Sequence, residues 1–110
     1  MTAREREIEA SLKANIEAEG GLFLKWVSPG NDGVPDRILI YNGRVIFVEL
    51  KTKPGKLSPI QVHQQERLRK AGATVVTTYG FAGSERLRVD LLDEREDLPK
   101  EYRGWVTETK

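Results

Sequence analysis

Apolar and polar positions alternate along this chain with two different periods, which predict helices and strands in turn. Over residues 3–19, apolar side chains recur every three or four positions, at Ile8, Leu12 and Ile16. This spacing predicts an amphipathic helix, for which Thr2 can serve as the cap. Runs rich in apolar, aromatic and β-branched residues predict four strands, over residues 22–27, 35–41, 44–51 and 73–79.

Two more helices are expected in the second half of the chain. Ser58 and Pro59 form a cap and a first helical residue, which predicts a helix that runs to about residue 70 and stops at Gly72. A last helix is expected from Ser84 to about Glu94, with leucines on its apolar side. The final residues, 98–110, are expected to form a peripheral arm.

The order of these elements predicts an α/β fold with an αβββαβ core and an additional C-terminal helix. Both faces of the strand pair over 35–41 and 44–51 are apolar, so helices should cover both sides of a mixed central sheet. We expect one domain over residues 1–97, with its core at about 4–80, followed by the arm.

A local turn signal places three polar residues together. The dipeptide Asn-Gly at positions 42–43 favours a two-residue type I′ hairpin turn. If the residues flanking this turn pair with each other, Asp36 lies directly across from Glu49, with Cβ atoms roughly 4.5–5.5 Å apart. Lys51 should point to the same face, because side chains alternate along a strand.

Opposed carboxylates repel each other, so this arrangement predicts a positive partner. Carboxylate oxygens suit Mg²⁺ or Mn²⁺, and such an ion can polarise a phosphate and lower the pKa of a bound water. Lys51 could position that water or stabilise the charge that develops on the phosphate. The alternative interpretation is a solvated salt bridge at the end of a strand.

Charge distribution favours a partner that carries phosphate. The net charge is only +1, but residues 22–89 hold eleven basic and five acidic side chains, while both flanking segments are acidic. The chain has 110 residues, 38% hydrophobic and 32% charged, and no cysteine, which fits a soluble protein of a reducing cytoplasm. No apolar run approaches the roughly 18–20 residues of a membrane span.

The motif around the carboxylates resembles a known nuclease signature. Val34-Pro35-Asp36 followed by Glu49-Leu50-Lys51 looks like the PD-(D/E)xK pattern. The longer set of segments, residues 33–36, 47–51 and 57–61 and then Gly72, resembles the virus-type replication–repair nuclease domain, VRR-NUC, in its stand-alone phage and bacterial form. The αβββαβ order of that superfamily matches the order predicted here.

The resemblance implies further site residues. A glutamate of the first helix should complete the metal site, and Glu5 matches this position best, although Glu9 lies one turn later on the same stripe. The backbone carbonyl of Leu50 should add a metal ligand. Gln61 should line the site and reach the attacking water or the phosphate, with Gln64 as a weaker substitute.

The remaining polar and aromatic candidates concern DNA. Basic residues near the site should hold the phosphate backbone; these are Lys25, Arg37, Lys53 and Lys56. His63 is expected to be structural or exposed rather than catalytic, and the three residues Trp26, Tyr79 and Trp105 are expected in the core or an interface rather than as platforms for bases.

The resemblance therefore implies a Mg²⁺- or Mn²⁺-dependent DNA endonuclease that selects branched DNA such as Holliday junctions and acts in DNA repair. It also implies a homodimer in the cytoplasm of a bacterial or phage-infected cell. Three alternatives remain open at this stage. One is a nucleic-acid-binding module without catalysis, another is a structural or regulatory subunit whose partner brings the chemistry, and the third is a nuclease that nicks or trims flapped, forked or single-stranded DNA.

Overall fold

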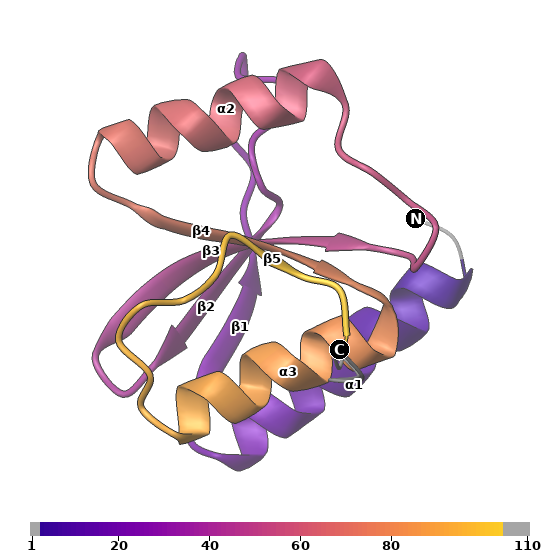
Figure 1. Ribbon diagram of the computed structural model, residues 1–110, viewed down its shortest axis with the longest axis vertical. Coiled ribbons are helices and arrows are strands. Elements are labelled where there is room, and N and C mark those ends of the chain that lie inside the picture. Colours follow the sequence, from indigo (N-terminus) through magenta and orange to yellow (C-terminus); the bar gives the residue numbers. More distant parts are fainter. Residues whose placement is uncertain (1–2, 105–110) are drawn as a thin grey trace, which may run out of the picture.

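The computed structural model describes residues 3–104, and within this range three helices cover the two faces of one sheet (Figure 1). The elements in chain order are α1 (Ala3–Ala18), β1 (Leu22–Lys25), β2 (Arg37–Tyr41), β3 (Arg44–Lys51), α2 (Pro59–Lys70), β4 (Thr74–Tyr79), α3 (Gly80–Leu92) and β5 (Glu101–Tyr102). This order confirms the predicted α/β class with its αβββαβ core and following helix. No helix of this range is long and apolar enough to cross a membrane.

The sheet is mixed, and its strands lie in chain order from β1 at one edge to β5 at the other. β1, β2 and β3 are antiparallel neighbours, whereas β4 runs parallel to β3 and β5 runs parallel to β4. Asn42 and Gly43 have φ angles of 53° and 79°, the positive values that a type I′ turn requires. Tyr41 pairs with Arg44 across this turn, so the predicted register of the hairpin is confirmed.

One face of the sheet carries most of the apolar core. α1 and α3 pack together on this face, opposite α2 (Figure 1). Aliphatic side chains of these two helices meet the inward residues of the central strands. Those no more than 2% exposed are Ile8, Leu12, Ile16, Leu39, Ile46, Val48, Val76, Leu87 and Leu91.

α2 begins with the predicted cap. The Ser58 side chain accepts the backbone N–H of Gln61 at 3.3 Å, and Gln61 Oε1 accepts the backbone N–H of Ser58 at 2.9 Å. Pro59 follows as the first helical residue, where its missing N–H has no cost. These reciprocal bonds form a capping box, which starts the helix at a fixed residue.

The segment after α3 corrects the expectation of a peripheral arm. β5 extends the sheet, and Tyr102 is 1% exposed with its hydroxyl donating to the Asp90 carboxylate of α3 at 2.7 Å. Gly83 permits this approach, because a Cβ there would collide with the carbonyl oxygen of Tyr102. Residues 98–104 are therefore part of the domain, and the rest of the expected arm lies outside the described residues.

Two predicted boundaries also shift. α3 begins at Gly80 rather than at Ser84, and the Ser84 hydroxyl lies buried inside the helix, where it bonds to Thr78 Oγ1 at 3.2 Å instead of capping an end. The first strand ends at Lys25, before the predicted Val27. The expected cap Thr2 and the aromatic residue Trp105 lie outside the described residues.

Candidate active site

The two predicted carboxylates meet at the end of the sheet where β2 begins and β3 finishes. Arg37 pairs with Val48, and continuing this ladder by one residue brings Asp36 opposite Glu49. Glu49 is only 7% exposed, whereas the Asp36 side chain is 53% exposed. The site therefore combines a buried carboxylate with a neighbouring carboxylate that faces solvent.

The surroundings of Glu49 disfavour its charged form. Burial raises the pKa of the Glu49 carboxyl to about 7, because a charged carboxylate loses its hydration there. The negative charge of Asp36 raises this pKa as well, Lys51 and Arg37 lower it, and Glu5 adds a smaller increase. Lys51 and Arg37 therefore do not fully offset the increase in the Glu49 pKa that burial and the neighbouring carboxylates cause.

Gln61 and Lys51 complete the arrangement around Glu49. Gln61 Nε2 donates to the Glu49 carboxylate at 3.3 Å, while its Oε1 is held by the backbone N–H of Ser58. The capping box thus fixes the amide with its nitrogen directed at Glu49. Lys51 is half-buried and lies two residues after Glu49 on the same face of β3.

The structure separates the glutamates of α1, which periodicity could not do. The Glu9 carboxylate forms an ion pair with Arg37, with 2.7 Å between Glu9 Oε2 and Arg37 Nε. This pair lies on the face of the sheet that α1 covers. Glu5 is half-buried and close enough to Glu49 to affect its pKa. Glu7 is exposed and lies 3.9 Å from Arg4. Glu5 therefore fits the site better than Glu9 does, and its place in a metal site stays a prediction.

Arg37 does not lie where the sequence interpretation placed it. It is 3% exposed, and besides Glu9 it bonds the backbone oxygen of Asp36 at 2.9 Å. Arg37 lies on the α1 side of the sheet, where it pairs with Glu9, and its Nη1 also lies 3.4 Å from the Asp36 carboxylate. The expectation that Arg37 contacts DNA at the surface is therefore wrong. The other cations expected at the DNA backbone are exposed, namely Lys25, Lys53 and Lys56.

Similarity to known proteins identifies the family of this chain. The sequence matches no family model. A curated protein of Acyrthosiphon pisum secondary endosymbiont phage 1, named Putative nuclease p44, is 42% identical over 74 residues, which cover 66% of this chain and 80% of that protein. A solved structure described as a VRR_NUC domain is 30% identical with a TM-score of 0.70, and the match covers 86% of this chain and all of that one. The chain belongs to the VRR-NUC family.

In this VRR-NUC chain, α2 is tied to the loop that leads into the site. Gln64, which the sequence offered as a substitute for Gln61, is buried and donates from Nε2 to the carbonyl oxygen of Asp32 at 2.8 Å. Gly33 packs against the same helix, because a Cβ there would lie 2.9 Å from the Ile60 side chain. Gln64 therefore holds the loop before Asp36 and does not face Glu49.

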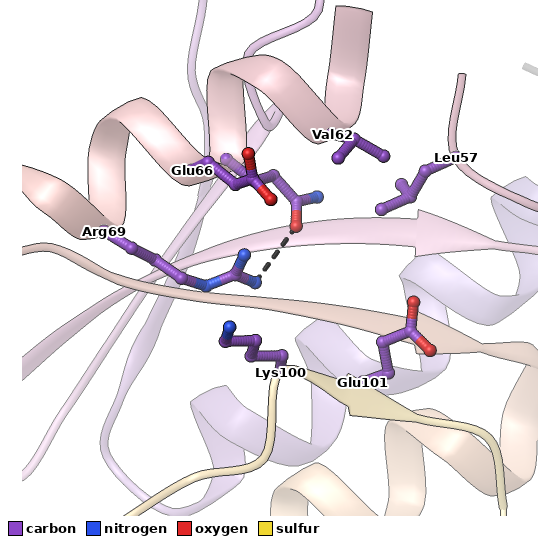
Figure 2. Close-up of a pocket in the computed structure, with 7 residues that line it drawn as sticks. Leu57, Val62, Glu66, Arg69, Lys100 and Glu101 are labelled. Atoms are coloured by element: carbon purple, nitrogen blue, oxygen red, sulfur yellow. Dashed lines mark hydrogen bonds between the residues drawn. The ribbon is translucent and has the colours of Figure 1, made fainter. Parts of the chain in front are cut away.

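A second buried amide ties α2 to the sheet of the VRR-NUC domain. Gln65 is 2% exposed, and its Nε2 donates to Thr77 Oγ1 at 2.9 Å. Thr77 is the β4 partner of Glu49, so this bond lies directly beside the site. Arg69 donates to Gln65 Oε1 at 3.1 Å, the bond that Figure 2 marks with a dashed line.

Sequence reasoning missed the anchoring role of these amides, although a signal was present. Gln61, Gln64, Gln65 and Leu68 recur at the spacing of a buried helical stripe. The stripe is mostly polar, so the apolar pattern alone did not reveal it.

The described part of the VRR-NUC chain offers a carboxylate pair rather than a complete metal cage. Within residues 3–104, no group of three or more His, Cys, Asp and Glu side chains is arranged to hold a metal ion. Any ion bound at Asp36 and Glu49 would therefore need further ligands from backbone, water or substrate.

Proposed function

We propose that this protein is a metal-dependent endonuclease that hydrolyses phosphodiester bonds in DNA. The observation that carries the proposal is the nearly buried Glu49, held by Gln61 and placed beside Asp36 and Lys51 at the end of one strand. Burying a carboxylate next to a second one is costly without a compensating function. The relative named a nuclease supports the same activity.

Mg²⁺ or Mn²⁺ is the cofactor that this donor set fits. Asp36 and Glu49 would hold the ion, with the Leu50 carbonyl as a further oxygen donor and Glu5 reaching it directly or through water. Mg²⁺ commonly uses one or two protein carboxylates and keeps several waters, which matches a site limited to a carboxylate pair. The ion would polarise the scissile phosphate and lower the pKa of a bound water.

The side chains around the pair would supply the remaining chemistry. Lys51 would orient the attacking water and offset the negative charge that develops on the phosphate. Gln61 would keep Glu49 in its binding orientation, because its own amide is fixed by Ser58. Attack opposite the 3′ oxygen would leave a 5′-phosphate, as the resemblance to the PD-(D/E)xK nucleases implies.

We also propose that the substrate is branched DNA, such as a four-way junction. The exposed lysines Lys53 and Lys56 follow β3 directly, and Lys25 ends β1, so all three could contact phosphates. Such contacts fix affinity and position rather than sequence. A domain of this size has little room for a sequence-reading element, which favours recognition of DNA shape.

An exposed apolar area supports assembly as a homodimer. On the sheet face that carries Glu49, the strand pairing forms two apolar rows, Leu22–Ile40–Val45 and Leu24–Ile38–Phe47. Leu22, Leu24 and Val45 are 43–53% exposed, and β1 is an edge strand. A second copy could cover this area. The resulting two-fold symmetry would present two sites to a symmetric junction.

A cleavage panel tests the proposed function. Labelled four-way junction, flap, single-stranded and linear duplex DNA are incubated with the protein in Mg²⁺, Mn²⁺ or EDTA. We expect metal-dependent cutting of the junction that the Lys51→Ala variant loses. If wild type and variant both leave every substrate whole, the non-catalytic binding module is the better explanation. Preferential cutting of flaps or single strands would replace the junction with that substrate. Light scattering of the protein with and without junction DNA tests the dimer.

A further inference from the structure

A cavity lies beside the candidate active site, and of the residues that line it only Lys53 has been given a role in DNA binding above. Its volume is about 250 Å³. It forms where α1 begins and where β3, β4 and β5 end, and the larger side chains that line it are Arg4, Ile8, Lys53, Tyr79, Phe81 and Arg103. Because neighbouring parallel strands have their C-terminal ends on the same side of a sheet, the cavity and the active site lie at that same end.

Strand pairing shows how close the cavity lies to the site. Tyr79 of the cavity is the β4 partner of Lys51, so their side chains are neighbours across the sheet. The next residue, Gly80, packs against Lys53, because a Cβ at Gly80 would lie 3.5 Å from the Lys53 Cβ. A nucleic-acid strand that reaches Lys51 would therefore pass the mouth of this cavity.

The charge of the lining favours an anion. Three cations, Arg4, Lys53 and Arg103, line the cavity, and among residues 3–104 no Asp or Glu does. Arg103 Nε donates to Glu101 at 3.3 Å, yet the Arg103 side chain is still 57% exposed, and that of Arg4 is 67% exposed. Both guanidinium groups are accessible to a ligand.

The cavity between α2 and β5 shows the contrasting case. There the cations Arg69 and Lys100 are interspersed with Glu66 and Glu101 (Figure 2). Mixed charges of this kind give no preference for an anion, so the cationic lining of the cavity beside the active site is not a general property of the surface.

Two aromatic rings accompany the cations. The Arg103 guanidinium carbon lies 3.9 Å from the centroid of the buried Tyr79 ring, a stacked arrangement that holds the arginine over it. Phe81 is 42% exposed, and the Arg4 guanidinium carbon lies 5.5 Å from its ring centroid. An exposed ring beside cations can accept an unpaired base by stacking while the cations bind the phosphate.

We propose that this cavity is a subsite for one unpaired nucleotide of the DNA strand next to the cleaved bond. Its phosphate would lie among Arg4, Lys53 and Arg103, and its base would stack on Phe81. In a continuous duplex the base is held in the helix and cannot reach the ring, so the subsite selects DNA in which a base is freed near the cut, as at the branch point of a junction. This inference rests on the proposed function, since it places the strand by the position of Lys51.

Fluorescence anisotropy with wild-type protein and variants tests the subsite. The probes are labelled oligothymidylate and a blunt duplex, both about twenty nucleotides long, with Ca²⁺ in place of Mg²⁺ to hold back cleavage. Phe81→Leu keeps apolar bulk but removes the ring, so oligothymidylate binding should weaken about fivefold or more, while duplex binding changes less than twofold. Phe81→Tyr should restore the binding.

The arginine contact has its own control. Arg103→Ala should weaken oligothymidylate binding and reduce the salt dependence by about 0.7 in the logarithmic slope, as loss of one phosphate contact predicts. Arg95→Ala removes a similarly exposed arginine beyond the other end of α3 and should leave both unchanged.

Three outcomes would overturn the subsite: no binding of oligothymidylate by wild type, an effect of Phe81→Leu that is absent or equal on both probes, or equal effects of the two arginine variants. A protein that binds through Phe81 but cuts no substrate would support the subsite and overturn only the proposed function.

Discussion

The two faces of the sheet are held by different forces. On one face, α1 and α3 bury aliphatic side chains, and the inward residues Leu39, Ile46 and Val48 are fully buried. On the other face, the residues of α2 that are buried are two glutamines, Gln64 and Gln65. Apolar contact is nonspecific and proportional to area, whereas amide hydrogen bonds fix direction.

This difference explains where the site lies. Glu49 points to the α2 side, so its partners are polar groups that can orient a carboxylate. Among the described residues, no buried side-chain nitrogen or oxygen lacks a hydrogen-bond partner, so the polar face avoids the cost of unsatisfied groups. The apolar face thus supplies most of the stability, and the polar face supplies the geometry. Four predictions test this division, from the largest expected effect to the smallest.

The first separates activity from folding on the polar face. Glu49→Gln keeps the shape of the side chain and an acceptor for Gln61 but removes the charge that would bind the cation. We expect cleavage to fall by about a thousandfold or more, comparable with the loss of a main electrostatic contribution, while the protein stays folded. Cleavage rates and circular dichroism measure the two effects. A variant that unfolds would show that Glu49 is structural.

The second removes apolar contact from the opposite face. Leu39→Ala leaves a cavity under α1 and α3 and should lower the free energy of unfolding by about 2–5 kcal/mol. Urea denaturation measures this loss. At a temperature where the variant is still folded, its cleavage rate should stay within about twofold of wild type, and a large loss of activity there would contradict the division between the faces.

The third breaks a directional bond of the polar face. Gln65→Ala removes the amide partner of the buried Thr77 hydroxyl, while Arg69 keeps its bond to the Val75 carbonyl, and the change should cost about 1–3 kcal/mol in unfolding free energy. It should also slow cleavage, because α2 carries Gln61. His63→Ala, on the exposed side of the same helix, is the matched control and should change neither quantity. Equal behaviour of the two variants would remove the anchoring role of Gln65.

The fourth concerns the contribution of α1 to the site. Glu5→Ala should slow cleavage about tenfold, since Glu5 is close enough to Glu49 to affect its charge. Glu7→Ala removes a carboxylate from the exposed side of the same turn and should have no effect on the rate. Cleavage rates at several Mn²⁺ concentrations compare the two, and identical rates would exclude Glu5 from the metal site.

Local sequence signals determined a large part of this protein. The Asn42-Gly43 turn set the register of the hairpin, and that register alone brings Asp36 opposite Glu49. The Ser58–Pro59 start of α2 was equally readable, because capping depends on neighbouring residues. The family resemblance then pointed to the nuclease site from four pieces of sequence, residues 33–36, 47–51 and 57–61 and then Gly72.

Other features were decided only when distant segments came together. Arg37 was expected at the surface. It is instead buried on the α1 face of the sheet, where it bonds Glu9, 28 residues away in the chain. The strand β5 has too few residues to give a sequence pattern. It forms because β4 offers backbone groups to pair with and Gly83 leaves room for the Tyr102 backbone. Phe81 stood out by no spacing, and its place beside Arg4 depends on α1 and α3 meeting at one end of the sheet.

What the sequence by itself determined about this protein is therefore the set of elements, the hairpin register and the carboxylate pair, since turns, caps and periodicity act over a few residues. The tertiary structure alone decided which glutamate of α1 approaches the site, which amides anchor α2, and which cations gather around Phe81. The physical reason is that ion pairs, buried hydrogen bonds and cavities depend on which distant side chains share one volume, and no local pattern records that.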